Sequence, residues 1–181
     1  MRKRRGIIVR QLLCGICVLM LTGCGSAGHL QDKDILCAAG CDGGSVTMEF
    51  YTDEKCLTVQ TDDISGVPAA AGLATGRELL TGHTSLIILS RRSSMDALVS
   101  ALKEWKVSPE CIIAVSDGQL LSGGEAQRLI GSVRRAQEQQ LVPDCGIVTV
   151  LGGLLGSNHE AEVPLLDKNG FCGTVLLKRD T

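Results

Sequence analysis

A regular pattern of apolar and polar positions begins after a short polar stretch that ends at residue 34. The run 35–41, "ILCAAGC", is continuously apolar, and the run 46–51, "VTMEFY", alternates between apolar and polar side chains. Between them, Asp42-Gly43-Gly44 supplies residues that tolerate the positive φ angles of a tight turn, so the pattern predicts a β-hairpin. Residues 56–61, "CLTVQT", alternate again and predict a third antiparallel strand.

Further along the chain, strand patterns and helix patterns follow one another. Pro68 suits the first turn of a helix through residues 69–80, although two internal glycines each cost about 1 kcal/mol relative to Ala. Residues 85–90, "SLIILS", and 111–115, "CIIAV", have the continuous apolar character of buried strands. Residues 173–178, "GTVLLK", predict a closing strand.

Two capping boxes mark the starts of amphipathic helices. The first, "SSMD" at residues 93–96, precedes apolar residues at helical spacing and predicts a helix over residues 94–106. The second is formed by the serine and the glutamate of "SGGE", residues 122–125, and opens a helix that runs to about residue 140. The two glycines of this segment do not indicate a phosphate-binding loop, because the Gly-Lys-Ser/Thr ending of that motif is missing. The capping box is sufficient to explain the segment.

These elements together predict a mixed α/β fold, in the α+β sense. Strand, helix, strand and helix in close succession imply right-handed crossovers and parallel strands. The expected architecture is an antiparallel hairpin joined to a partly parallel sheet with about three to four helices. Residues 145–156 stay undecided, because Asp144 is a plausible helix cap whereas the β-branched residues 147–150 favour a strand.

The N-terminus has the features of an export signal. Arg2 to Arg5 form a basic head, and residues 11–23 give an uncharged run of 13 residues, short of the roughly 20 that cross a bilayer as a helix. A permanent transmembrane span is therefore the weaker interpretation. Residues 1–23 are predicted to be a signal peptide, residues 24–34 a polar tether, and residues 35–181 one α/β domain.

The end of this signal resembles the lipobox of bacterial lipoproteins, in which a Leu, a small residue and a Gly precede a cysteine that is diacylated. Here these residues are Leu21, Thr22, Gly23 and Cys24. The resemblance implies that Cys24 becomes the lipidated N-terminus of the mature protein, with two acyl chains as a firm membrane anchor. The alternative is an ordinary signal peptide that is cleaved nearby, with Cys24 incidental.

Charge narrows the choice of partners. Residues 1–23 hold five positive charges and no negative ones, so their removal changes the formal net charge from −2 to −7. An acidic body without a basic cluster interleaved with aromatics excludes nucleic acid as the expected partner.

Six cysteines remain after Cys24: Cys37, Cys41, Cys56, Cys111, Cys145 and Cys172. An even number in an exported chain is compatible with disulfides. Several of them lie within apolar runs, where a cysteine behaves as a small buried hydrophobe, so free core thiols are favoured. Cys37 and Cys41 would lie about 13 Å apart along a strand, too far for a disulfide between them.

The sequence offers few candidates for catalysis. Gly82 and His83 enter the strand at 85–90, and His83 is either a catalytic base or, as we prefer, a structural residue that caps the strand entry. His159 has no second histidine at metal-binding spacing, and Asp117-Gly118 after a strand is read as a turn. No enzymatic activity, metal or other cofactor is expected.

Taken in order, several segments resemble the N-terminal domain of the spore-germination receptor C subunits, the Ger(x)C lipoproteins of spore-forming Firmicutes. The similarity begins at Cys24 and continues through "KDILCAAGCDGGSVTMEF". "TGHTSLIILS", with the pair Gly82-His83, is the most specific element, followed by "CIIAVSDG". "VPLLDKNGFCGTVLLKRD" is similar to the stretch that closes the family's domain.

The resemblance implies a non-catalytic subunit, lipid-anchored on the outer face of the inner spore membrane. Its partners would be the polytopic A and B subunits, and together they would respond to small germinants. On this interpretation Gly82 and His83 are structural, and the exposed helix face around Arg128, Arg134 and Arg135 is a candidate docking surface. Two other hypotheses stay open: a general cell-envelope lipoprotein that acts as a binding module, and a thiol enzyme that uses Cys37 or Cys111 with His83.

Overall fold

The computed structural model describes most of the chain beyond the N-terminal segment, namely residues 32–52, 55–61, 63–90, 95–118 and 121–179. Contacts divide the chain into residues 1–32 and residues 33–181, and the fold below is that of the second unit. The signal peptide, the lipobox residues Leu21, Thr22 and Gly23, and the lipidation site Cys24 lie outside the described residues.

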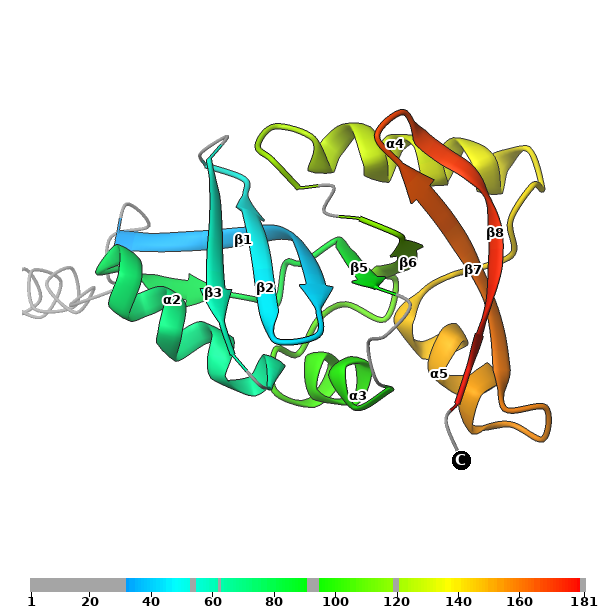
Figure 1. The fold of residues 1–181 in the computed structure, drawn as a ribbon, viewed down its shortest axis with the longest axis horizontal. Coiled ribbons are helices and arrows are strands. Elements are labelled where there is room, and N and C mark those ends of the chain that lie inside the picture. The colour runs from blue at the N-terminus through cyan, green and yellow to red at the C-terminus, as the bar shows by residue number, and fades with distance from the viewer. Residues whose placement is uncertain (1–31, 53–54, 62, 91–94, 119–120, 180–181) are drawn as a thin grey trace, which may run out of the picture. The chain divides into compact units, whose positions relative to one another are not determined.

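The second unit is built on one mixed sheet of eight strands (Figure 1). The strand order is β3-β2-β1-β5-β6-β7-β8, with β4 also paired to β1. Neighbours among β1, β4, β5, β6 and β7 are parallel, whereas β2, β3 and β8 run antiparallel to their neighbours. The strands are β1 (Lys33–Asp42), β2 (Ser45–Phe50), β3 (Cys56–Gln60), β4 (Glu78–Leu80), β5 (Leu86–Ser90), β6 (Ile112–Ser116), β7 (Glu160–Asp167) and β8 (Gly170–Lys178).

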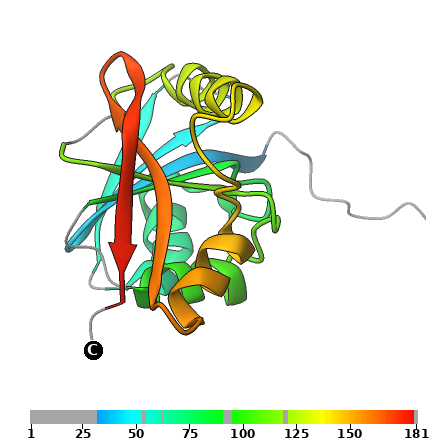
Figure 2. The ribbon, with the colours of Figure 1, turned by 90° about the vertical axis from the view of Figure 1, so that its right-hand side faces the viewer.

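Helices cover the two faces of this sheet unequally. Figures 1 and 2 show α4 alone on one face and α2, α3 and α5 together on the other. The bounds are α2 (Val67–Thr75), preceded by a short 3-10 helix η2 (Ile64–Gly66), α3 (Met95–Lys103), α4 (Ala126–Glu138) and α5 (Ile147–Leu155). The predicted mixed α/β fold, with an antiparallel hairpin on a partly parallel sheet, is confirmed.

The predicted helix over residues 69–80 is wrong in its second half. Helix α2 ends at Thr75 because Gly76 takes a left-handed conformation with φ of 71° and closes the helix with its N–H on the Gly72 carbonyl. Residues 78–80 then form β4, which pairs in parallel with the first residues of β1. Strand β1 begins at Lys33, so the last two residues of the predicted tether belong to it.

The undecided segment 145–156 is helix α5. Asp144 accepts hydrogen bonds from the Gly146 N–H at 3.0 Å and the Thr149 hydroxyl at 2.7 Å. These two bonds lower the pKa of the Asp144 carboxyl below its usual range. The β-branched side chains are tolerated because the buried positions, Ile147, Val150, Leu151 and Leu154, have the spacing of one helix face.

A residue from β2 completes the start of α4. Glu125 accepts hydrogen bonds from the N–H and the hydroxyl of Ser122, which is half of the predicted capping box. The helix itself begins at Ala126, and the carboxylate of Glu49 accepts the N–H groups of Glu125 at 3.1 Å and of Ala126 at 3.0 Å. Ser93 of the other predicted box lies outside the described residues.

The core lies between the sheet and the helices and is mostly aliphatic. Leu36, Ile87 and Ile113 at the centres of three parallel strands are completely buried. Trp105, 2% exposed, is the largest buried side chain, and its indole N–H donates to the Ile64 carbonyl at 3.1 Å. Within the described residues, the helices are too short or too polar to span a bilayer.

Candidate functional site

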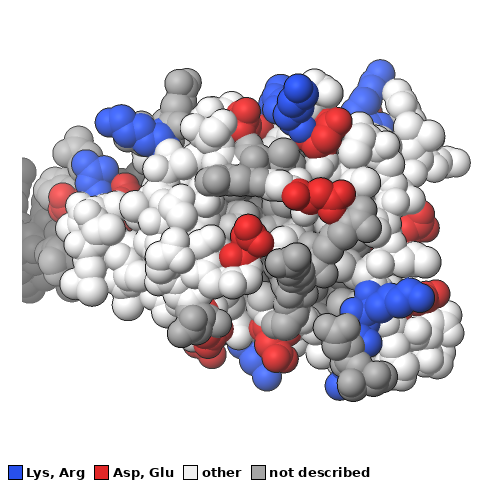
Figure 3. All heavy atoms as spheres, in the orientation of Figure 1, with Lys and Arg blue, Asp and Glu red and all other residues white. Residues whose placement is uncertain are grey.

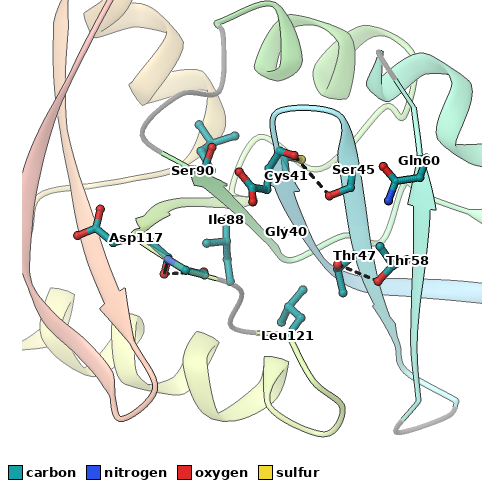
Figure 4. Close-up of a pocket in the computed structure, with 14 residues that line it drawn as sticks. Gly40, Cys41, Ser45, Thr47, Thr58, Gln60, Ile88, Ser90, Asp117 and Leu121 are labelled. Carbon is teal, nitrogen blue, oxygen red and sulfur yellow. Dashed lines mark hydrogen bonds between the residues drawn. The ribbon is translucent and has the colours of Figure 1, made fainter.

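A pocket lies at the carboxyl ends of three parallel strands, β1, β5 and β6 (Figure 4). After β1 the chain turns back to β2 on one side, whereas after β5 it proceeds through α3 to β6 on the other side. In open α/β sheets, ligands bind in the crevice that such a change of direction leaves at the carboxyl ends. This cavity of about 270 Å³ is called the strand-end pocket below.

Strand register brings polar side chains onto the floor of the strand-end pocket. Thr47 of β2 pairs with Gly40 of β1 on one side and with Thr58 of β3 on the other. Ser45 of β2 likewise pairs with Gln60 of β3. Because directly paired residues share a sheet face, these side chains lie together on the α4 side of the sheet.

Hydrogen bonds fix part of this floor. The hydroxyls of Thr47 and Thr58 lie 3.0 Å apart and are joined by a hydrogen bond (Figure 4). The Ser116 hydroxyl donates to the Gly118 carbonyl at 3.0 Å and accepts its N–H at 3.2 Å, which holds the turn after β6. Asp117, predicted to lie in a turn, lines the pocket from this turn.

A second, wider hollow of about 480 Å³ lies at the opposite ends of the parallel strands, where β5 and β6 begin. Gly82 and His83, singled out from the sequence, both line it, and so do Arg134 and Cys111. We call it the His83 hollow. Tyr51 and Ser85 at its rim are joined through their hydroxyls at 2.7 Å.

The turn that carries His83 is held by two threonines that the sequence analysis did not identify. The Thr81 hydroxyl donates to the Trp105 carbonyl at 3.1 Å, and the Thr84 hydroxyl donates to the Thr81 carbonyl at 2.6 Å. His83 is exposed, and its imidazole makes no hydrogen bond within the described part of the chain. The side chain therefore does not cap the strand entry.

The three arginines of the candidate docking surface have different surroundings. Arg128 donates to the Lys168 carbonyl at 3.0 Å, across to the turn between β7 and β8. Arg135 pairs with Glu138 at 2.9 Å on the same helix. Of the three, Arg134 lines the His83 hollow.

Burial controls the chemistry of the cysteines. Cys37, Cys41, Cys111 and Cys145 are buried, as expected for core thiols, whereas Cys56 is half-buried and Cys172 is exposed. Desolvation raises the pKa of Cys41 and that of Cys111 to about 12, so both are thiols at neutral pH. Cys111 and His83 line the same hollow, but Cys111 is only 1% exposed.

Charge is mixed over the surface. On the face drawn in Figure 3, basic side chains lie along the periphery, and the middle of the face shows acidic but no basic side chains among the described residues.

His159, in a turn before β7, is exposed, and no group of His, Cys, Asp and Glu within the described ranges has metal-binding geometry.

The hydroxyl floor of the strand-end pocket was missed by the sequence analysis. The signal for it is the set of polar positions that alternate with the apolar ones in "SVTMEF" and "CLTVQ".

A scan against protein-family models, a search of curated proteins and a search of solved structures each give no significant match to this chain.

Proposed function

We propose that the chain is a lipid-anchored, non-catalytic subunit of a spore germinant receptor, held at the membrane through Cys24. The main support is the order of the segments that resemble the receptor C subunits. These segments are the β1–β2 hairpin, β5, β6 and the β7–β8 hairpin, which are neighbours in one sheet. The resemblance thus runs through one folding unit from Lys33 onward, not through scattered fragments.

A non-catalytic role is supported by the state of the thiols. A cysteine nucleophile reacts as the thiolate, which needs a lowered pKa and access for the substrate. Cys111 has the opposite properties, since burial raises its pKa to about 12. Cys37 also has a raised pKa, mainly through desolvation, and its sulfur accepts a hydrogen bond from Gln127 at 3.2 Å.

The partner subunits contact the face of α4 beside the His83 hollow. Arg134 is exposed there and makes no ion pair within the described residues, so its charge is available to a partner. Arg128 is already engaged in holding the β7–β8 turn, and Arg135 has an acidic partner. The docking surface is therefore narrower than the three arginines suggest.

The experiment is affinity recovery of the tagged full-length chain from detergent-solubilised inner membranes of spores, with mass spectrometry of the eluate. We expect the polytopic A and B subunits to co-purify with the wild-type chain. Cys24→Ala should move the chain out of the membrane fraction. Recovery of the wild-type lipoprotein without A and B subunits contradicts the receptor function and leaves a general cell-envelope lipoprotein, which would also be present in vegetative cells.

Charge reversal tests the docking face. Arg134→Glu should reduce recovery of the A and B subunits at least several-fold, because a rim charge that faces its complement is turned into a repulsive one. Arg135→Glu is the matched control on the same helix, and it should leave recovery nearly unchanged. Equal recovery with both variants contradicts the contact at Arg134.

One observation favours the thiol enzyme as a second candidate, namely that Cys111 and His83 share a hollow. Alkylation of the folded protein with iodoacetamide, followed by peptide mapping, separates the two functions. We expect Cys172, which is exposed, to be labelled first, and Cys41 and Cys111 to react only after unfolding. Fast labelling of Cys111 that is lost in His83→Ala would establish an activated thiol instead.

A further inference from the structure

The strand-end pocket is a concavity on the less covered face of the sheet. On this face α4 packs near β8 and β1, and no helix among the described residues covers β2 and β3. The polar floor is instead approached by the chain that leaves β6. Leu121, 1% exposed, lies over Gly40, where an added Cβ would be 3.7 Å from its Cδ1. Gly40 thus leaves room for the cavity.

The lining of this pocket is rich in groups that both donate and accept hydrogen bonds. Five hydroxyls and one amide line it, from Ser45, Thr47, Thr58, Gln60, Ser90 and Ser116. Asp42 and Asp117 also line it, and Ile88, Leu89 and Leu121 supply apolar surface. No Lys, Arg or His from the described part of the chain lines the cavity.

This lining discriminates among classes of small molecule. Among the described residues, no positively charged side chain lines the pocket to bind an anion. A wholly apolar compound would cover the polar groups of the lining without offering them a hydrogen bond. Sugar and polyol hydroxyls match the lining, because each of them can donate one hydrogen bond and accept others.

We propose that the strand-end pocket binds a small, uncharged, polyhydroxylated compound such as a monosaccharide or a cyclitol. Its volume of about 270 Å³ is just below the roughly 300–1,000 Å³ of pockets for drug-sized ligands, which fits a single ring. The hydroxyl pair of Thr47 and Thr58 faces the ring hydroxyls, and the apolar side chains pack against its C–H groups. This inference goes beyond the proposed receptor function and does not rest on it.

The direct test is saturation-transfer NMR on the full-length chain in a detergent without a sugar headgroup. The probes are D-glucose and myo-inositol, with glucose 6-phosphate, L-alanine and ethanolamine as charged comparators. We expect saturable binding of at least one uncharged probe and much weaker binding of the phosphorylated sugar. Absence of saturable binding by both uncharged probes overturns the proposal, as does a preference for any charged comparator.

Two variants locate the binding in the pocket. Thr47→Val combined with Thr58→Val removes the hydroxyl pair from the pocket floor, so binding should weaken about tenfold. Gly40→Ala adds one methyl group to the floor at ordinary contact distances and should weaken binding by a similar factor. Thermal melting shows which variants fold, and Gly40→Ala keeps the test decisive if the double variant does not.

Matched controls lie outside the pocket. Thr174→Val changes an exposed threonine on β8, and Gly131→Ala adds a methyl group to α4 where no atom lies within 4 Å. Both should bind the uncharged probe with wild-type affinity. Wild-type affinity in folded Gly40→Ala overturns the location of the site. Co-purification of the A and B subunits is a separate readout, so the failure of either proposal is recognised independently of the other.

Discussion

Glu49 shows how a single buried carboxylate links the N-terminal hairpin to the rest of the domain. It is 4% exposed and accepts both N–H groups at the start of α4. In Glu49→Gln, the amide oxygen can still accept one of these two backbone N–H groups. The amide NH₂ then faces the other N–H, and two donors cannot form a hydrogen bond. We expect the free energy of unfolding to fall by about 2 kcal/mol, as for a lost hydrogen bond to a buried charged group. Urea unfolding measures it.

The control for this prediction is Glu138→Gln, which removes a charge from the exposed end of the same helix. Its ion pair with Arg135 is between side chains that are 64% and 73% exposed, so its loss should change stability by no more than about 0.5 kcal/mol. Similar effects of the two substitutions would show that Glu49 does not act as the cap of α4.

Asp144 predicts a dependence of stability on pH. Its folded-state pKa is lowered by the Gly146 N–H and the Thr149 hydroxyl, so its contribution is complete above the unfolded-state pKa. That contribution is lost as the pH falls through the lower folded-state pKa. Asp144→Ala should cost about 0.5–1 kcal/mol at pH 7, at the low end for a cap because solvent screens the exposed carboxylate.

Urea unfolding of wild type and Asp144→Ala at several pH values between neutral and about 2 gives the measurement. The difference between the two proteins should stay constant down to about pH 4, the ordinary range of the Asp pKa, and then shrink. A difference that is independent of pH over the whole range would mean that the ionised carboxylate is not what stabilises the start of α5.

At the scale of elements, Gly76 separates α2 from β4. A residue with a Cβ adopts this φ of 71° only at a cost of about 1 kcal/mol. Gly76→Ala should therefore lower the free energy of unfolding by that amount. Gly131→Ala is the control, because this glycine is exposed in the interior of α4 and Ala should stabilise the helix by about 0.5–1 kcal/mol. The two substitutions thus have opposite signs in urea unfolding, and equal signs would contradict the role of Gly76.

The elements that the sequence predicts well are those with an unbroken pattern. The β1–β2 hairpin has a glycine turn and clear alternation, and α4 has a long amphipathic repeat. Strand β4 was missed because only three residues form it, and its partner β1 lies far away in sequence. In α5, the helical spacing of buried residues overrides the β propensity of residues 147–150, because packing on the sheet determines the outcome.

The candidate site was less predictable than the fold for a similar reason. Gly82 and His83 were identified, yet the bonds that hold their turn come from Thr81 and Thr84. The hydroxyls of the strand-end pocket come from β2, β3, β5 and β6, and each of them alone is an ordinary polar position of a strand. Only strand order and register place them together.

At the scale of the whole domain, the β7–β8 hairpin is attached by few bonds. Strand β7 pairs with β6 through only two residue pairs, Val115 with Leu165 and Ser116 with Leu166. On the α4 side, the Ser132 hydroxyl accepts the Phe171 N–H at 3.1 Å, and Arg128 reaches the Lys168 carbonyl. The hairpin is therefore the part of the sheet that we expect to open first.

Hydrogen exchange tests this expectation, because local opening exposes amides at a free energy below that of global unfolding. The amides of β8 that bond to β7 should exchange faster than those of β5, which has parallel neighbours on both sides. Ser132→Ala should increase the exchange of β8 further and leave β5 unchanged. Ser100→Ala in α3, on the other face of the sheet, is the control and should not alter β8. Equal protection of β5 and β8 would mean that the two hairpins and the parallel strands open as one cooperative unit.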